Sequence, residues 1–341
     1  MALSTDDRKP LRMVSCPGCG AKIFIPGDLP PLGTTPCTKC GHVLMMPMQL
    51  RQFELRTAIA SGGMGTVYRA FDTMLQREVA VKLMKRELAE EPNALESFYR
   101  EARAAAALNH TNIIHIYTFD EYDGQLYLVM ELADNGSLDS RIESKGRCTE
   151  LEVLDVGYAV AGALNKALQH GLLHRDIKPG NILFNAENEP KLVDFGLAKK
   201  ADSDDDGDGA IWGTPYYIAP EKIKREREDF LSDEYSLAGT LYHALTGHVP
   251  FEAPTIEAVV AAHVHTPLTP PNQVVPEVSQ MTSDAIAKAM AKNPADRFQS
   301  YDEFAMALYA ARSYYLVNYY KTQQSGEGKP NAQTKSWWRR G

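Results

Sequence analysis

The apolar pattern between Phe53 and about Arg312 changes once, from strand-like to helical, and this change limits the possible fold more than any other feature. Runs that alternate or are rich in β-branched residues predict strands near 53–60, 65–71, 78–84, 115–120 and 125–131. A helical period follows near 150–170, 230–246, 255–263, 281–292 and 301–318, and the Ala-rich segment 93–108 is also predicted to be a helix. A strand-rich part followed by a helix-rich part predicts an α+β fold with two lobes.

Two Cys-x-x-Cys pairs precede this region, Cys16 with Cys19 and Cys37 with Cys40, and each is followed by Gly, a short apolar strand and a proline. Four thiolates on two such turns can close a tetrahedron around Zn²⁺, which leaves no open position for a substrate. We therefore predict a zinc-ribbon-like module over residues 13–47 whose metal is structural, because so few residues bury too little apolar surface to fold alone. Two disulfides are an alternative. A redox-active pair is another, but it needs a strand–helix–strand context that is missing here.

Composition and charge argue against several classes of protein. Lys and Arg total 36 and Asp and Glu total 44, so the net charge is −8, and nucleic acid is not an expected partner. No run approaches 18 uninterrupted apolar residues, and the N-terminus lacks the apolar core of a signal peptide. We therefore expect a cytoplasmic protein without a membrane span, in which the cysteines are reduced.

A series of short motifs follows in a fixed order inside the two-lobed region. The motifs are the glycine-rich segment 60–67, Val79-Ala80-Val81-Lys82, Phe98–Arg103, Leu128–Ala133, His174-Arg175-Asp176-Ile177-Lys178-Pro179-Gly180-Asn181, Asp194-Phe195-Gly196, and Gly213–Glu221 with its Ala-Pro-Glu end. Each motif alone is a weak signal, but their combination in this order is specific.

On these motifs, residues 53–312 resemble the kinase domain of bacterial-type serine/threonine protein kinases. The resemblance implies a signalling enzyme that transfers the γ-phosphoryl group of ATP to Ser or Thr hydroxyls of protein substrates, with Mg²⁺ as a second cofactor. Lysine two places after Asp176 is the serine/threonine pattern. One departure is that the first glycine of the family's loop is Ala60 here, which adds a methyl group to the loop.

The resemblance implies catalytic roles for five residues. Asp176 would accept the proton of the substrate hydroxyl, and Lys178 would neutralise charge on the transferring phosphoryl group. Lys82 would hold the α- and β-phosphates, with Glu101 as its counter-charge. Thr214 would bond to Asp176 and Lys178.

The resemblance also implies a nucleotide site. Asn181 and Asp194 would hold Mg²⁺, and Met130 would be the gatekeeper before the hinge. The other residues expected around ATP are Ala60, Ser61, Gly62, Gly63, Met64, Gly65, Val67, Ala80, Lys82, Glu131, Ala133 and Leu183. In the helical lobe, Glu221 is expected to pair with Arg297, and Asp233 to orient the backbone near Asp176.

Three other interpretations were weighed against this one. A pseudokinase scaffold usually lacks the lysine, the base or the metal-binding aspartate, but Lys82, Asp176, Asn181 and Asp194 are present. A small-molecule phosphotransferase lacks the Ala-Pro-Glu segment. A third interpretation makes the ribbon the main binding module, one for nucleic acid, with the kinase regulating it. Zinc ribbons often bind nucleic acid or protein, and the sequence does not choose between these partners.

The chain is thus expected to have four parts: a flexible start at 1–12, the zinc module at 13–47, the kinase domain at 53–312, and a helix end with a disordered tail at 313–341. We expect the kinase domain to stay active without residues 1–47. Five aspartates surround Ser203 between residues 202 and 208, and our hypothesis is that they supply Arg175 with a permanent anion in place of a phosphoryl group. A solvated acidic loop is the alternative.

Overall fold

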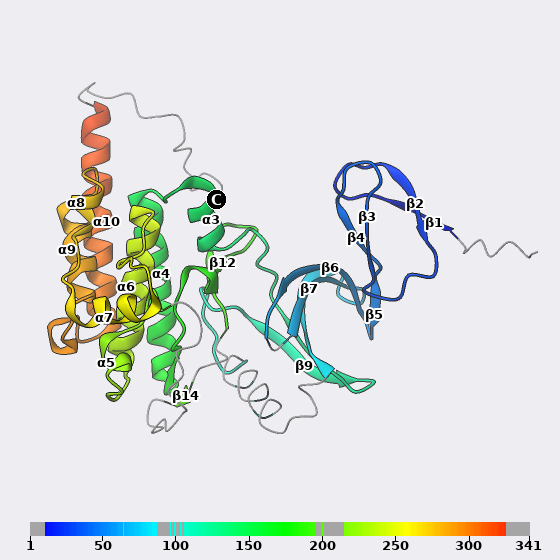
Figure 1. Cartoon of the computed structure of the whole chain (residues 1–341), viewed down its shortest axis with the longest axis horizontal. Helices are drawn as coiled ribbons and strands as arrows, with labels where there is room; N and C mark the ends of the chain where they lie inside the picture. The colour runs from blue at the N-terminus through cyan, green and yellow to red at the C-terminus, as the bar shows by residue number, and fades with distance from the viewer. Residues whose placement is uncertain are drawn as a thin grey trace, which may run out of the picture. The chain divides into compact units, whose positions relative to one another are not determined.

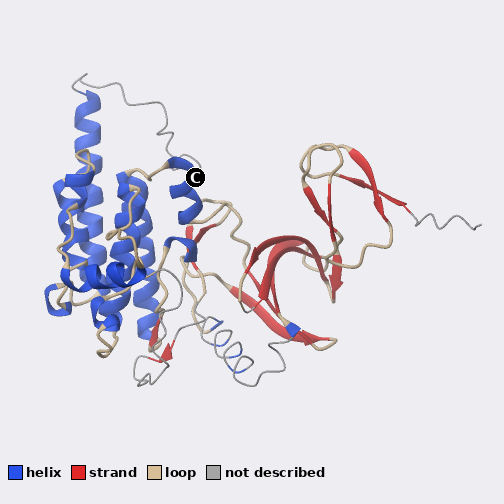
Figure 2. Ribbon diagram, viewed as in Figure 1, coloured by secondary structure: helices blue, strands red, loops and turns tan. Residues whose placement is uncertain are grey.

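The chain divides into two compact units. The computed structural model describes residues 11–63, 65–86, 96, 99, 103, 106–194, 199–200 and 215–324. One unit comprises Met1–Asn109 and Ile114–Asp134, and the other comprises His110–Ile113 and Asn135–Gly341. Strands dominate the first unit and helices the second (Figure 2). The predicted α+β fold, strand-rich first and helix-rich second, is confirmed.

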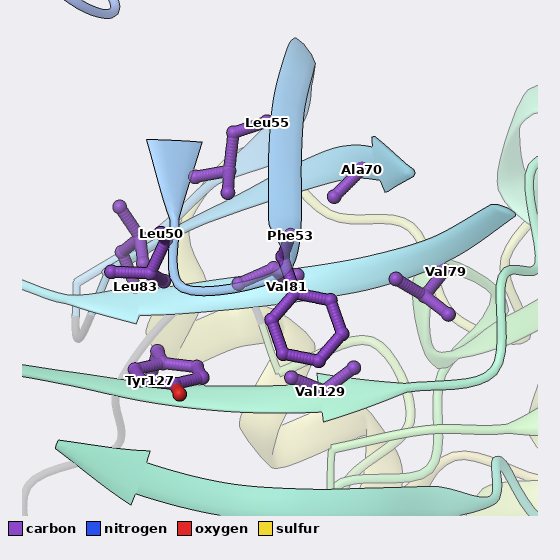
Figure 3. Packing of buried hydrophobic residues seen from close by; sticks show 9 residues of the cluster. All are labelled: Leu50, Phe53, Leu55, Ala70, Val79, Val81, Leu83, Tyr127 and Val129. Carbon is purple, nitrogen blue, oxygen red and sulfur yellow. The ribbon is translucent and has the colours of Figure 1, made fainter. Parts of the chain in front are cut away.

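Six strands of the first unit form one antiparallel sheet within the described residues, in the order β5-β6-β7-β8-β10-β9. They are β5 (Met48–Leu50), β6 (Phe53–Ser61), β7 (Gly65–Asp72), β8 (Arg77–Met84), β9 (Ile116–Tyr122) and β10 (Gln125–Met130). Their buried side chains pack into the cluster drawn in Figure 3, which consists of Leu50, Phe53, Leu55, Ala70, Val79, Val81, Leu83, Tyr127 and Val129. Burial of a large apolar side chain contributes about 1.5–3 kcal/mol, so this cluster is the main source of the sheet's stability.

The N-terminal module consists of two short antiparallel hairpins, both in the first unit (Figure 1). The first pairs β1 (Leu11–Ser15) with β2 (Lys22–Pro26), and the second pairs β3 (Thr34–Pro36) with β4 (Val43–Met45). Their small shared core contains Cys16, Ile23, Ile25, Cys37, Leu44 and Met46. The sequence predicts a flexible start through residue 12. Leu11 and Arg12 instead belong to β1, because they pair with Pro26 and Ile25 across the hairpin.

The second unit is built mainly from helices. They are α3 (Leu138–Lys145), α4 (Glu150–Gln169), α5 (Pro220–Ile223), α6 (Phe230–Thr246), α7 (Ile256–His265), α8 (Pro271–Val274), α9 (Gln280–Ala289) and α10 (Tyr301–Gln324), with 3-10 turns η1 (Pro179–Asn181) and η3 (Pro294–Asp296). Helix α4 packs against both α6 and α10 (Figure 1). Gly157 permits this packing, because a Cβ there would lie 2.7 Å from Leu241 of α6 and 3.0 Å from Leu308 of α10.

Helix ends in the second unit follow local capping rules. Thr149 and Glu152 form a reciprocal capping box at the start of α4, and Ser137 forms one at the start of α3. Helix α6 stops at Gly247, whose φ of 78° suits glycine. The sequence analysis did not predict α3, which spans only eight residues.

The two last helices differ in length from the prediction. Helix α9 ends at Ala289 instead of about residue 292, because Met290 leaves the helical conformation with φ −96° and ψ 15°, and the N–H of Ala291 bonds to the carbonyl of Lys288, only three residues back. Helix α10 continues to Gln324 instead of about residue 318, since no Gly or Pro occurs before Gly326. The first residues of the predicted disordered tail are therefore helical.

Two short hairpins complete the second unit. Strand β12 (Ile182–Phe184) pairs with β13 (Pro190–Leu192), and β11 (Leu172–Leu173) pairs with β14 (Lys199–Lys200). The β12–β13 hairpin lies between the segment 174–181 and Asp194. Among the described residues, no helix combines the length and the apolar character needed to cross a membrane.

Candidate active site and metal site

Asp233, in the first turn of α6, fixes the start of the loop from His174 to Asn181. The two carboxylate oxygens of Asp233 accept the backbone N–H groups of His174 and Arg175, each at 2.7 Å. The side chain is 2% exposed, and this burial raises its pKa while the two N–H donors act in the opposite direction. Asp233 thus holds the backbone immediately before Asp176, as the sequence analysis expects.

The His174 side chain bonds to two backbone groups, one within the loop and one just after β13. Its Nδ1 accepts the N–H of Asp176 at 3.3 Å, so the ring proton lies on Nε2, which donates to the carbonyl of Val193 at 2.9 Å. Between these two residues Arg175 has a φ of 66°, in the left-handed region that non-glycine residues rarely adopt. Several short bonds therefore hold a strained turn, which is the kind of backbone that clusters at functional sites.

Asp176, Lys178 and Asn181 converge in this loop. The Nζ of Lys178 donates to Oδ2 of Asp176 at 2.7 Å. The Nδ2 of Asn181 donates to the Asp176 carbonyl at 2.8 Å and to Oδ2 at 3.0 Å. The Asp176 side chain is 34% exposed and Lys178 45%, so both are open to a ligand, whereas Asn181 is buried. The three side chains can therefore meet a bound hydroxyl and its phosphoryl donor.

The β12–β13 hairpin places Asn181 and Asp194 at the same end. Ile182 pairs with Leu192, and one step earlier the N–H of Val193 donates to the carbonyl of Asn181 at 3.0 Å. Asp194 follows directly, with a φ of 61° and an exposed side chain. Amide and carboxylate oxygens are ligands that Mg²⁺ accepts, so this hairpin end suits a magnesium ion.

In the first unit, the glycine-rich segment forms the turn between β6 and β7. The N–H of Gly62 donates to the carbonyl of Gly65 at 2.9 Å. Packing requires Gly65, because a Cβ there would lie 2.0 Å from the carbonyl oxygen of Leu83. A Cβ at Gly62 would meet only the Gly65 carbonyl at 4.0 Å, and one at Gly63 would meet nothing within 4 Å among the described residues. Glycine at 62 and 63 is therefore explained better by close approach of a ligand than by packing.

The residues that flank this turn lie in regular strands. Ala60 pairs with Val67, and Ser61 pairs with Thr66, with 3.0 Å between the two hydroxyl oxygens. Ala60, which replaces the family's first glycine, thus lies in β6 and not in the turn itself. A methyl group is acceptable at such a position, because strands accommodate any Cβ.

Lys82 lies in β8, a central strand of the sheet. It is opposite Val67 on β7 and Leu128 on β10, and its side chain is half-buried. Ala80, two residues earlier on the same face, is buried and pairs with Met130. These positions place a lysine, an alanine and a valine on neighbouring strands, as the nucleotide site requires.

The chain after β10 is fixed by His115. The N–H of Glu131 donates to the His115 carbonyl at 2.8 Å, and the Glu131 carboxylate accepts the His115 N–H at 3.3 Å. Ala133 is 8% exposed. In the second unit, Leu183 lies in β12 opposite Lys191. Three predicted site residues, Met64, Glu101 and Thr214, lie outside the described residues, as do Ser203 and its aspartates.

The docking segment, residues 215–221, is tied to the helices by the predicted ion pair. Arg297 donates to both oxygens of Glu221, at 2.7 and 2.8 Å, and the two side chains are 0% and 4% exposed. Ser232 adds a bond to Glu221 at 2.7 Å. Burial opposes the charged carboxylate, but the Arg297 bonds prevail and the pKa of Glu221 is lowered. This is a bidentate, fully hydrogen-bonded buried pair.

Further contacts of the docking segment have no sequence signal. The hydroxyl of Tyr217 lies 2.7 Å from Nδ1 of His243 on α6, and Ser236 donates to the Tyr217 carbonyl at 2.8 Å. Lys222 of α5 donates to the carbonyl of Arg175 at 3.4 Å, which links the docking segment to the His174–Asn181 loop. These partners are far apart in sequence and belong to common residue types, so periodicity and spacing do not identify them.

The four N-terminal cysteines form a cluster that could hold a metal ion, which is the candidate metal site. Their sulfur atoms all lie within 4.8 Å of one another, and the Cys16–Cys40 and Cys19–Cys37 distances are 3.7 and 3.9 Å. A tetrahedron with Zn–S bonds of about 2.3 Å has sulfur atoms about 3.8 Å apart. All four are free thiols in this structure. The cluster therefore fits a single tetrahedral metal ion.

The two halves of the metal site repeat the same backbone turn. Cys16 and Cys37 each accept an N–H from the residue four places on, Gly20 or Gly41, at 2.8 and 2.9 Å. These glycines have φ values of 69° and 76°, which side chains resist. The Lys39 N–H donates to the Cys37 sulfur at 3.4 Å, and this bond lowers the pKa of Cys37 to about 7. A backbone bond from His42 acts to lower the pKa of Cys40, but the neighbouring thiols and burial outweigh it and raise that pKa to about 12. The second turn thus favours the thiolate at Cys37.

Comparison with known proteins agrees with this geometry. The protein kinase domain family matches residues 53–309. The chain is 37% identical over 268 residues to the serine/threonine-protein kinase PknB of Mycobacterium leprae, covering 77% of this chain and 43% of that protein. It is 35% identical over 264 residues to PknE of Mycobacterium tuberculosis (77% and 46%), and 34% identical over 262 residues to PknH of the same species (76% and 42%). The chain therefore spans less than half the length of these relatives.

Proposed function

Because this chain belongs to the protein kinase family, we propose that it transfers the γ-phosphoryl group of ATP to Ser or Thr hydroxyls of protein substrates. The observation that carries the proposal is the convergence of Asp176, Lys178 and Asn181 in a loop fixed by Asp233. The names of the relatives, all serine/threonine-protein kinases, support the choice of acceptor.

The role proposed for Asp176 follows from its bonds. Lys178 and Asn181 both donate to Oδ2, so the proton of the substrate hydroxyl would go to Oδ1. Lys178 would then lie beside the transferring phosphoryl group and stabilise its charge. Because the loop backbone is already fixed, little reorganisation is needed when the hydroxyl attacks, and catalysis is mostly positioning.

Asn181 and Asp194 would hold Mg²⁺, which when bound neutralises charge on the phosphates. Both N–H bonds of Asn181 use Nδ2, so its amide oxygen is the atom directed to the metal. In the first unit, Lys82 would bind the α- and β-phosphates, and Gly62 and Gly63 would let the backbone approach them. The Glu131 N–H is used by His115, so the Glu131 carbonyl is the hinge group that would accept a bond from adenine.

We propose one structural zinc ion per chain, held by Cys16, Cys19, Cys37 and Cys40. The sulfur spacing and the repeated turns support this proposal, and four thiolates leave no site for catalysis. The zinc module is therefore proposed to be a structural element.

The direct test is a phosphorylation-site map of the purified chain and a general protein acceptor after incubation with Mg·ATP. Phosphoserine and phosphothreonine are expected, with none formed by Lys82→Met. Lys82 is half-buried and is not part of the sheet core, to which its neighbour Val81 on β8 and Val129 on β10 belong, so this variant should keep its folded far-UV spectrum. Phosphotyrosine alone, or ATP turnover without any labelled protein, would refute the proposed substrate class.

A further inference from the structure

The loop between the two metal-binding turns contributes to two different hydrophobic cores. Leu29 packs against the core of the zinc module, with Cys16, Ile23 and Leu44. Leu32, three residues later, packs against the core of the six-stranded sheet. Both leucines are half-buried. One short loop therefore holds the metal site and the sheet together.

The segment that follows the second metal-binding turn also passes from the core of the zinc module to the core of the sheet. Met46 is buried in the core of the zinc module, and Met48, two residues later, packs against the sheet core as the first residue of β5. The two connections are bonded to each other, since the Leu32 N–H donates to the Met46 carbonyl at 2.9 Å and the Met46 N–H donates to the Gly33 carbonyl at 2.8 Å. Module and sheet thus share a two-stranded junction and not a flexible linker.

Leu32 reaches the sheet core at a conformational cost. Its φ is 63°, a value that is exceptional for a bulky residue. A tight turn holds it there, because the Gly33 N–H bonds to the Pro30 carbonyl at 2.9 Å, and a Cβ at Gly33 would lie 2.8 Å from that oxygen. Such strain persists only where the surrounding structure fixes it, here the metal-binding turns on one side and the sheet core on the other.

The core that Leu32 joins is also the support of the nucleotide-binding strands. It contains Leu50 of β5 and Phe53 and Leu55 of β6, and β6 leads directly to the glycine-rich turn. It also contains Val81, the residue before Lys82. Loss of Leu32 from this core would therefore loosen the strands that carry the phosphate-binding groups.

We propose that metal binding at the four cysteines stabilises the sheet that binds ATP, so that zinc occupancy and nucleotide affinity are coupled. This inference rests on the proposed zinc site. The free energy of binding a structural metal is folding free energy of its module, and the junction transmits part of it to the sheet. Coupling of this kind is reciprocal in binding free energy, so bound nucleotide must also raise the affinity of the four cysteines for zinc. The chain without residues 1–47, which is expected to stay active, should bind nucleotide more weakly, because the removal takes Leu32 out of the sheet core.

The first test is amide hydrogen exchange of the full chain with and without a zinc-selective chelator. Chelation is expected to lower protection in residues 48–61 and 77–84 by about tenfold, since protection reports local opening. Leu32→Ala should lower protection there even with zinc bound, and chelation should then add little. Leu29→Ala is the matched control: with saturating zinc, its sheet should be protected as in the wild type.

The second test measures the reciprocal effect. In an equilibrium competition with a chromogenic chelator, the apparent affinity for zinc is expected to rise several-fold when Mg·ADP saturates the wild-type chain, and not in Leu32→Ala. The coupling is refuted while the zinc site stands if the purified chain holds zinc, chelation does not change the protection of the sheet, and nucleotide does not change the apparent affinity for zinc. If the purified chain holds no zinc, the site and the coupling are both refuted.

Discussion

The zinc module and the docking segment are both short stretches held at a few points, but different bonds hold them. The module buries only a few apolar side chains, and its two turns meet at four sulfur atoms. The docking segment is held by Glu221 and Arg297, which are enclosed by helices that have a large core of their own. The stability of the module is therefore proposed to depend on a bound ion, whereas that of the docking segment depends on the protonation state of a buried carboxylate.

Because of this difference, different changes are expected to destabilise the two regions. Chelation or loss of one thiolate should act on the first unit, and loss of one carboxylate should act on the second. The first two experiments below each break one of these regions and use a control residue of the same type elsewhere in the chain.

The largest effect is expected for Cys37→Ser. A structural zinc site contributes on the order of 10 kcal/mol at neutral pH, and serine is a much weaker ligand, so zinc should fall from one per chain to a small fraction. Elemental analysis of protein purified without added metal measures this. Cys148→Ser is the control, because Cys148 is a free buried thiol whose pKa burial raises to about 11. Equal zinc in both variants would contradict the four-cysteine site.

The next effect is on the stability of the second unit. Glu221→Gln removes the charge that balances Arg297 inside the protein and should cost about 3–5 kcal/mol in the free energy of unfolding. Denaturant titration followed by a probe in the helices measures it. In the control, Glu252→Gln, the glutamate is 65% exposed beside His248, and a change below about 1 kcal/mol is expected. Equal effects would mean that the buried pair does not anchor the docking segment.

The same pair predicts a pH dependence. The pKa of Glu221 in the folded chain lies below its unfolded value, so its stabilisation is complete above the unfolded pKa and is lost as the pH falls through the folded pKa. The stability difference between wild type and Glu221→Gln should therefore be constant near neutral pH and shrink in acid. A difference that grows as the pH falls would contradict the direction of the shift.

The smallest effect is expected for Ser203→Ala. If the neighbouring aspartates supply the anion for Arg175, kinase activity after phosphatase treatment should change by less than about twofold. Changing Asp204, Asp205 and Asp206 together to Asn should lower activity more, and most clearly at low salt, because salt screens the attraction between charges in the wild type. A silent triple change together with an inactive Ser203→Ala would show an ordinary phosphorylation switch.

Much of the strand and helix pattern followed from the sequence, because it depends on local periodicity. The Val79–Lys82 run and the helix that starts after Thr149 are examples, since alternation and a capping box are both local signals. The Glu221–Arg297 pair was predicted through a family resemblance and not through spacing. The four-cysteine site followed from spacing alone, since the two turns repeat.

The contacts that sequence reasoning missed are long-range ones between common residues. Glu150 accepts bonds from Ser279 and Thr282, about 130 residues away, and no local pattern marks any of the three. Glu234 is buried as well, and burial raises its pKa to about 8. The junction at Leu32 was missed for a different reason: a Pro- and Gly-rich segment predicts a loop, and nothing in its composition shows which core the loop's leucines enter.

The most direct test of the proposed chemistry is transfer of labelled γ-phosphate to protein by Asp176→Asn, with nucleotide binding measured on the same preparation. Asp284→Asn, an exposed aspartate of α9, is the control and should behave as the wild type. Asp176→Asn is expected to lose at least about 10³-fold in transfer, because its carboxylate is the proposed proton acceptor. It should bind Mg·ATP normally, because that carboxylate is assigned to the substrate hydroxyl and not to adenine. Transfer within a few-fold of wild type would contradict the assignment of Asp176 and with it the proposed mechanism.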